Sequence, residues 1–373
     1  LKVSLKIGEK YEVSPTLASG ALNSSLQACL VGALLVIIFM VVYYSAGGII
    51  AVFSVGTNVL LVIACLAGIF QATFTLPGMA ALVLTIGMAV DANILIFERI
   101  REELKSGKSS ENALLGGYEK AFSTIIDANF TTLITASILI WLGTGPVKGF
   151  GITLAIGIVT SVFCALFISR LLLTVLLAAG VKNLISLKAI EKSNARGEID
   201  FHKYRKLAFF ISWVVVAVGI ASIYLNKEKI LGIDFRGGEE SIVSFGEMID
   251  AGDLDETFAA ATEIGEVQHV YRSEVGSGEE ASRLVLQTEV GKGREVISLL
   301  QSKFPSANLV EQGLSNIGAS VSDQITNDAI SSVLVALIGI LLYVAIRFEM
   351  GYAIGAVVAT VHDVLMTIGL FVL

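Results

Sequence analysis

The stretch Gly87 to Glu103, which reads GMAVDANILIFERIREE, decides the fold of this chain. From Gly78 to Phe97 every residue is apolar or small except Thr85, Asp91 and Asn93. A run of about twenty such residues is long enough to cross the hydrocarbon core of a bilayer as one helix. The sequence therefore predicts a membrane-spanning helix with an acid inside it.

The position of Asp91 makes this acid costly. Asp91 lies eight residues before Arg99, so at a rise of about 1.5 Å per residue it lies about 12 Å inside the boundary that Arg99 marks. An aspartate near the bilayer centre costs roughly 2.5–3.5 kcal/mol on insertion scales. The carboxyl is either a buried group that only fixes helix packing, or a titratable group on an ion or proton path. Desolvation favours the protonated form of a carboxyl, as a proton carrier requires.

The composition of the chain is that of a polytopic membrane protein. Of its 373 residues, 54% are hydrophobic and 16% are charged, and the mean hydropathy is +0.78. The first residue is not Met, no signal peptide is visible and the last residues lie in an apolar run, so we expect an internal piece of a longer protein. The cysteines and histidines are scattered without metal-ligand spacing. We expect no metal and no cofactor other than protons.

Eight apolar spans are predicted, and basic loops orient them. The spans are 26–45, 49–69, 78–97, 124–142, 150–179, 207–225, 328–346 and 352–373. Basic residues gather in the loop 98–123 and in the linker 180–206, which the positive-inside rule makes cytoplasmic. The predicted order is the end of an outer domain (1–25), a five-span membrane domain (26–180), a cytoplasmic linker (181–206), one span (207–225), an outer domain (226–327) and further spans (328–373).

The outer segment 226–327 is predicted to be an α+β domain. Its pattern reads strand 240–246, helix 252–264, strand 267–273, strand 282–289, helix 293–304 and strand 308–313. This βαββαβ order is the ferredoxin-like arrangement. Between residues 230 and 318 there are 16 acidic and 6 basic residues. That balance argues against nucleic acid and anionic lipid as ligands, although solubility alone also explains it.

An internal repeat divides the chain into two related halves. With an offset of 305 residues, Val42–Leu60 overlays Arg347–Leu365, and Thr57-Asn58 falls on His362-Asp363. Transporters are commonly built from such repeats. On this interpretation the first half lacks its start and the second half lacks its last three spans.

Two further acids lie in predicted spans. Asp127, Thr131 and Thr135 share one helical face, which lines a hydrated path or bonds a neighbouring helix. Asp127 follows a basic loop closely, so an interfacial, structural position is the alternative. Asp363 lies about eleven residues into its span, near mid-membrane. A packing role for the adjacent His362 is equally compatible with the sequence.

Several of these stretches together resemble the SecD/SecF protein-export family of bacteria. Gly87 to Ile100 resembles the family's Gly-x-x-Val-Asp-Ala-Asn-x-Leu-Ile-x-Glu-Arg-Ile signature. Three more stretches are similar to family motifs: Phe122–Thr132, Gly143–Gly151 and Leu231–Gly238. Arg347-Phe-Glu and His362-Asp-Val match later SecF motifs. The resemblance covers nearly the whole chain, as a fusion of the later part of SecD with the first part of SecF.

The resemblance implies a fold, a function and partners. The implied fold is a polytopic α-helical bundle of resistance-nodulation-division (RND) type, with two pseudo-symmetric halves and a ferredoxin-like periplasmic domain. The implied function is a proton-driven accessory of the Sec translocon in the bacterial inner membrane, not an enzyme. Its implied partners are SecYEG, SecA, YajC, unfolded preprotein and membrane lipid, without nucleic acid. The implied proton relay is Asp91, Asp127 and Asp363, supported by Asn93, Thr131 and His362.

Two other functions are alternatives to a proton-driven accessory of the translocon. An RND exporter of lipids or small molecules typically has much larger outer domains, and a non-transporting scaffold leaves Asp91 unexplained. The sequence has no Walker motif, nucleophile elbow or metal set. For the proton relay we expect Asp91 to face a bundle interior that Asp127 and Asp363 also border, with the space beside Asp91 filled by the second half's remaining spans or open without them.

Overall fold

The structure is a computed structural model that describes residues 9–69, 75–181, 200–230, 232–261, 265, 267–273 and 282–372. Eight of the described helices are long and apolar enough to cross a membrane, as predicted. The chain forms two compact units. One contains Leu1–Asn23, Ser212–Ile330 and Asp363–Leu373, and the other contains Ser24–Ile211 and Ser331–His362. The alternating pattern of residues 1–17 predicts the last strand of an outer domain, and residues 1–8 of this stretch lie outside the described residues, as do residues 182–199 of the predicted linker.

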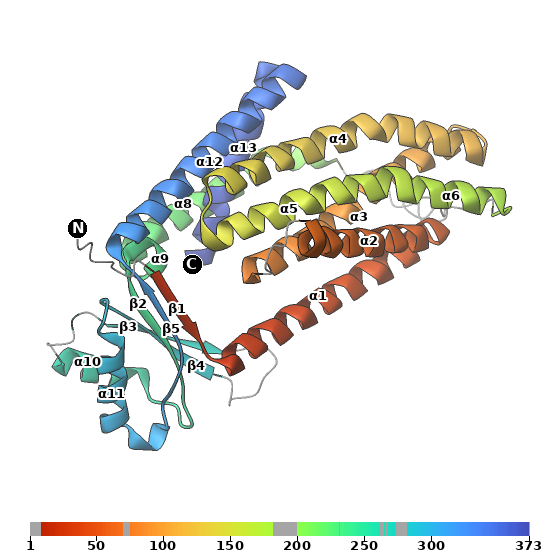
Figure 1. The fold of residues 1–373 in the computed structure, drawn as a ribbon. Coiled ribbons are helices and arrows are strands. Elements are labelled where there is room, and N and C mark those ends of the chain that lie inside the picture. The colour runs from red at the N-terminus through yellow and green to blue at the C-terminus, as the bar shows by residue number, and fades with distance from the viewer. Residues whose placement is uncertain are drawn as a thin grey trace, which may run out of the picture. The chain divides into compact units, whose positions relative to one another are not determined.

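The described helices cover nearly all of the predicted spans, and several extend well beyond them (Figure 1). Those of the first half are α1 (Pro15–Tyr44), α2 (Ala46–Ala64), α3 (Leu76–Lys105), α4 (Ser110–Leu142), α5 (Gly145–Phe163) and α6 (Ser169–Ala178). Single π-helical turns extend α2 at Cys65–Ile69 and join α5 to α6 at Cys164–Ile168. The spans of the second half are α8 (Arg205–Ile230), α12 (Ala319–Arg347) and α13 (Met350–Val372).

The predicted loop 98–123 is instead a helical hairpin. Both α3 and α4 continue through it, and only residues 106–109 form the turn. The residues there are mainly Glu, Arg, Leu, Lys and Ala, which are strong helix formers. Ser109 caps the start of α4, because its Oγ accepts a hydrogen bond from the Asn112 nitrogen at 3.4 Å. The basic residues that indicate membrane orientation therefore lie largely on helices.

Close packing and a buried carboxylate hold this hairpin together. Glu103 on α3 is 3% exposed. It pairs with Lys108 in the turn and, at 2.5 Å, with Lys120 on α4. At Gly117 of α4 an added Cβ would lie 2.9 Å from the backbone nitrogen of Ile100, closer than real Cβ atoms approach. Glycine is therefore required where the two helices cross.

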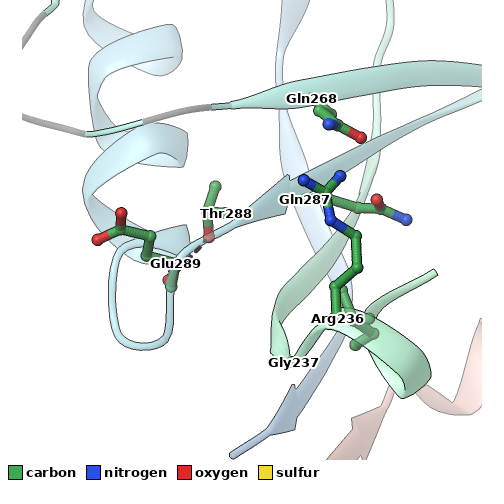
Figure 2. Close-up of a pocket in the computed structure, with 7 residues that line it drawn as sticks. Arg236, Gly237, Gln268, Gln287, Thr288 and Glu289 are labelled. Atoms are coloured by element: carbon green, nitrogen blue, oxygen red, sulfur yellow. Dashed lines mark hydrogen bonds between the residues drawn. The ribbon is translucent and has the colours of Figure 1, made fainter. Parts of the chain in front are cut away.

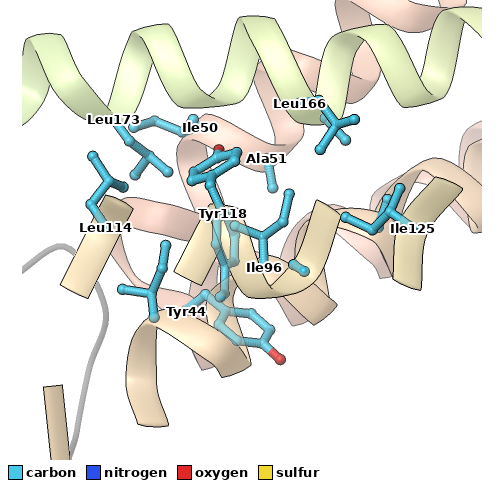
Figure 3. Close-up of a cluster of buried hydrophobic side chains, with 14 of the residues drawn as sticks. Tyr44, Ile50, Ala51, Ile96, Leu114, Tyr118, Ile125, Leu166 and Leu173 are labelled. Atoms are coloured by element: carbon cyan, nitrogen blue, oxygen red, sulfur yellow. The ribbon is translucent and has the colours of Figure 1, made fainter. Parts of the chain in front are cut away.

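The largest buried cluster joins α1, α2, α3, α4 and α6 (Figure 3). It includes Tyr44, Ala51, Ile96, Tyr118 and Leu173. Because lipid is as apolar as these side chains, close fit between helices stabilises the bundle more than removal from water does. The Tyr118 hydroxyl shares a hydrogen bond of 2.5 Å with the Ser169 hydroxyl, which satisfies both polar groups inside the cluster.

The α/β segment has the predicted βαββαβ order. Its elements are α9 (Ile233–Arg236), β2 (Gly238–Ser244), α10 (Ala251–Ala260), β3 (Gln268–Ser273), β4 (Ser282–Thr288), α11 (Gly293–Lys303) and β5 (Val310–Ile317). The strands pair antiparallel in the order β5-β2-β4-β3, which is the ferredoxin-like order. Leu254 of α10 and Leu300 of α11 pack in one cluster with Val243 and Leu286 of the sheet.

A fifth strand, β1 (Glu9–Val13), joins this sheet beside β5. The two strands are antiparallel, with Glu9 opposite Ile317 and Val13 opposite Gly313. The sequence predicts a strand near this position but not its partner. The sheet thus contains one strand from the first half of the chain and four from the second.

The element boundaries agree with the 305-residue repeat. Adding 305 to the bounds of α1 gives 320–349, and α12 spans 319–347. Adding 305 to the bounds of α2 gives 351–369, and α13 spans 350–372. Each half therefore has a strand followed by two closely joined spans. The superposition of the two halves stays a prediction.

Candidate functional site

Asp91 lies on a face of α3 that the described helices leave uncovered. Its side chain is exposed, and it makes no hydrogen bond or ion pair with the residues that the structure describes. One turn earlier on the same face, a Cβ added at Gly87 would meet no atom within 4 Å. The neighbours Val90 and Ala92 are each 6% exposed, so the other side of α3 is packed. The residues that the structure describes therefore leave the space beside Asp91 open.

Asn93 belongs to the packed side of α3 and not to the Asp91 face. Two residues of an α-helix are about 200° apart around its axis, and Asn93 is 1% exposed. Its Nδ2 donates to the Ala89 carbonyl at 3.0 Å, while its Oδ1 has no hydrogen-bond partner among the described residues. The structure therefore does not bring Asn93 to Asp91.

Asp127 is held by residues far away in the sequence. The Tyr343 hydroxyl and the Arg347 Nε of α12 each donate to Asp127 Oδ1 at 2.9 Å. The Arg347 Nη2 donates to the Ser123 hydroxyl at 2.8 Å, and that hydroxyl donates to Asp127 Oδ2 at 3.3 Å. Asp127 is 17% exposed and Arg347 is 46% exposed by side chain. The cluster is a charge-assisted link between α4 and α12.

The threonines of the predicted polar face bond to their own helix. Thr131 Oγ1 donates to the Ala128 carbonyl at 2.7 Å, and Thr135 Oγ1 donates to the Thr131 carbonyl at 3.3 Å. The sequence left two alternatives for this face, a hydrated path or hydrogen bonds to a neighbouring helix. In the structure Asp127 is bonded to a neighbouring helix, α12. No sequence pattern predicts that Tyr343 and Arg347 contact this face. The available signal was that each helix carries two polar groups at i and i+4, namely Ser123 with Asp127 and Tyr343 with Arg347.

Asp363 and His362 lie together on α13. Asp363 is exposed, and its backbone carbonyl accepts a hydrogen bond from Thr367 Oγ1 at 2.8 Å. Asp363 belongs to a different compact unit from Asp91 and Asp127. The interior that these three acids are expected to share stays a prediction.

A second polar cluster, which no sequence pattern predicts, lies at the end of α1. The Tyr44 hydroxyl donates to Glu98 Oε1 of α3 at 2.9 Å, and Arg101 Nη1 donates to the same oxygen at 2.8 Å. Arg101 is 1% exposed. Its guanidinium carbon lies 5.0 Å from the ring centre of Tyr43 and 5.1 Å from that of Tyr44, within cation–π range.

The α/β segment has a small polar pocket of about 210 Å³. Arg236 of α9 extends toward Gln287 and Gln268 in this pocket, and Thr288 and Glu289 line its other side (Figure 2). Gly237 and Gly238 have φ angles of 73° and 132°, which L residues rarely adopt, so this glycine pair shapes the turn into β2. The described residues contain no group of three or more side chains that could hold a metal ion.

The fold and the acids inside its spans define a polytopic helical membrane protein that is built from two related halves and carries an α/β domain. Residues 1–179 and 296–373 match the family described as protein export membrane protein SecD/SecF, C-terminal. The match covers more than half of the chain, and the chain belongs to this family.

Relatives and solved structures agree with the assignment. The chain is 33% identical over its whole length to the protein translocase subunit SecDF of Brucella abortus, and spans 48% of that protein. Over 49% of its length it is 52% identical to the subunit SecD of Magnetococcus marinus, of which it spans 34%. The crystal structure of SecDF from Thermus thermophilus, a translocon-associated membrane protein, matches 98% of the chain at 29% identity with a TM-score of 0.85, over 49% of that structure. The chain therefore spans about half the length of its SecDF relatives.

Proposed function

We propose that this chain is part of a proton-driven accessory subunit of the Sec translocon, which promotes translocation and release of preprotein on the periplasmic side. The proposed partners are SecYEG, SecA, YajC and unfolded preprotein, and the proposed location is the bacterial inner membrane. The proposed role with the translocon is supported by the names of the relatives, which are protein translocase subunits SecD and SecDF. The proposals of proton coupling and of roles for individual residues are argued from the membrane helices of this chain.

Asp91 is the proposed proton carrier, and one observation carries the proposal. A carboxyl inside an apolar span has no partner among the described residues and lies on an uncovered helix face. An acid in such a position has a high cost when it is charged and a lower cost when it is protonated. Protonation of Asp91 therefore favours an arrangement in which this face of α3 contacts apolar groups, and ionisation favours one in which it contacts polar groups or water. Asp127 and Asp363, predicted as further members of the relay, and Asn93, Thr131 and His362, predicted as its supporting groups, are proposed to assist Asp91.

The available energy is sufficient for a domain movement. One proton that crosses a potential of roughly 150 mV contributes about 3.5 kcal/mol. A ligand that prefers one of two states by a few kcal/mol can reverse their populations. Each proton can therefore drive the outer α/β segment between two orientations.

The test is Asp91→Asn in the full-length protein. We expect the variant to accumulate normally, since a neutral amide costs less to bury in the membrane than a carboxylate. Preprotein translocation into inverted membrane vesicles, measured with and without a proton gradient, should lose its gradient stimulation. Asp91→Glu, which keeps the titratable group, is the matched control and should retain part of it. Wild-type stimulation in Asp91→Asn would end the proposal.

A further inference from the structure

Two membrane helices are joined directly to neighbouring strands of the sheet, the edge strand β1 and the adjacent strand β5. Only Ser14 separates β1 from α1, and only Gly318 separates β5 from α12. The strands β1 and β5 pair with each other. A helix of 29 residues such as α12 is about 43 Å long at 1.5 Å per residue. A displacement at the far end of either helix can therefore reach the sheet through continuous, hydrogen-bonded backbone.

The far end of α1 is bonded to the helix that carries Asp91. Tyr44 is the last residue of α1, and its hydroxyl donates to Glu98 of α3. Arg101 completes this contact through Glu98 and the ring of Tyr44. Glu98 follows Asp91 by seven residues, so both lie on the same face of α3. We call Tyr44, Glu98 and Arg101 the α1 anchor.

The far end of α12 is bonded to the neighbouring helix α4. Arg347 is the last residue of α12, and with Tyr343 it holds Asp127, while Ser123 bridges the two charges. We call these four residues the α12 anchor. Helix α4 packs tightly on α3 through Gly117 and Ile100, so α12 is linked to the Asp91 helix through one intermediate helix.

The two anchors occupy related ends of the repeat but use different chemistry. The offset of 305 places Val42 of α1 on Arg347 of α12, and Tyr44 on Glu349. The residues that form the anchors are therefore not copies of each other. A polar contact with another helix of the bundle is nevertheless present at the end of both helices, with α3 for α1 and with α4 for α12.

We propose that the α1 and α12 anchors transmit a change at Asp91 to the β1–β5 strand pair, and that Arg347, Tyr343 and Tyr44 are positioning residues for this coupling. The inference rests on the proposed function. In it, the ion pair between Asp127 and Arg347 stays formed while Asp91 changes its charge. Charge-assisted hydrogen bonds suit this task, since they are directional and resist sliding of one helix along another. Loss of an anchor should uncouple proton movement from export without blocking the protons.

The experiment measures two quantities on the full-length protein in vesicles: proton flux and gradient-stimulated preprotein export. For Arg347→Gln we expect export stimulation to fall by about fivefold or more, with proton flux within about twofold of wild type, as for the loss of a coupling free energy. The exchange Asp127→Arg with Arg347→Asp should restore most of the stimulation. Tyr44→Phe, which removes only one hydroxyl, should uncouple more weakly.

Arg99→Gln is the matched control, because Arg99 is paired at 2.7 Å with Glu102 on its own helix. It should change neither quantity. If Arg347→Gln keeps wild-type stimulation, or loses flux and export together, or if the exchanged pair stays uncoupled at normal membrane levels, the anchor proposal is wrong. Asp91→Asn in the same vesicles separates the two proposals, since failure of the proposed function leaves gradient stimulation in that variant.

Discussion

The tripeptide Asp-Ala-Asn occurs in two spans, at Asp91–Asn93 of α3 and at Asp127–Asn129 of α4, and the two copies can be compared directly. The asparagines behave alike. Asn93 Nδ2 donates to the carbonyl four residues earlier at 3.0 Å, and Asn129 Nδ2 does the same at 2.8 Å. The aspartates differ: Asp127 is bonded to Tyr343 and Arg347, whereas Asp91 has no partner among the described residues.

The difference between the copies shows which properties of a membrane acid are local. A bond from Asn to its own helix needs only the helix, so identical sequence produces it twice. The state of the acid depends on α12, whose contributing residues are more than 200 positions away in the chain. The same three letters therefore occur once with an acid that is bonded to another helix and once with an acid that has no partner among the described residues.

The largest effect should come from making Asp91 resemble Asp127. Gly87→Lys places a cation one turn before Asp91 on the same face, where an added Cβ meets no atom within 4 Å. The ammonium should pair with Asp91 as Arg347 pairs with Asp127, and it should reduce gradient-stimulated export by about tenfold or more, because a fixed ion pair opposes exchange of a proton at the carboxyl. The measurement is export in vesicles at several external pH values.

Gly87→Ala is the control for this substitution. It should preserve export, because the methyl group has room. A loss of export in Gly87→Ala as well would show that another helix lies against this face in the full-length protein, and the effect of lysine would then be steric.

A smaller difference is expected in stability. Asp127→Asn breaks the ion pair with Arg347 and should lower the midpoint of thermal unfolding by a few degrees. Asp91→Asn removes an unpaired carboxyl from the membrane and should leave the midpoint unchanged or raise it. Thermal unfolding of both variants in the same detergent compares them. Equal shifts of the same sign would contradict the contrast between the two sites.

The smallest effect should distinguish the asparagines. Asn93 is 1% exposed, whereas Asn129 is only partly buried. Asn93→Ala should cost about 1 kcal/mol of unfolding free energy through the void it leaves, and Asn129→Ala should change it by less than about 0.5 kcal/mol. Denaturant unfolding of the two variants and of the wild type measures both changes in unfolding free energy. If Asn129→Ala is the more costly, burial does not determine the contribution of these asparagines.

Some of the candidate site could be predicted because it depends on short-range patterns. The spans follow from hydrophobic runs, and Asp91 is prominent because an acid interrupts one of them. The ferredoxin-like strand order follows from alternating strands and helices in residues 238–317. The loop 98–123 was predicted wrongly, since its charges suggested a loop while its residues favour helix over most of that length.

The sequence by itself determined the membrane class of this protein, its eight spans, the α/β segment and the intramembrane position of Asp91, because each of these depends on residues that are close together in the chain. Only the tertiary structure decided that β1 pairs with β5, that Asp127 is held by Arg347 and that Tyr44 bonds Glu98. Those contacts join residues 54 to more than 300 positions apart. Which distant polar groups meet depends on how the helices and strands pack, and a single sequence carries no local pattern that specifies it.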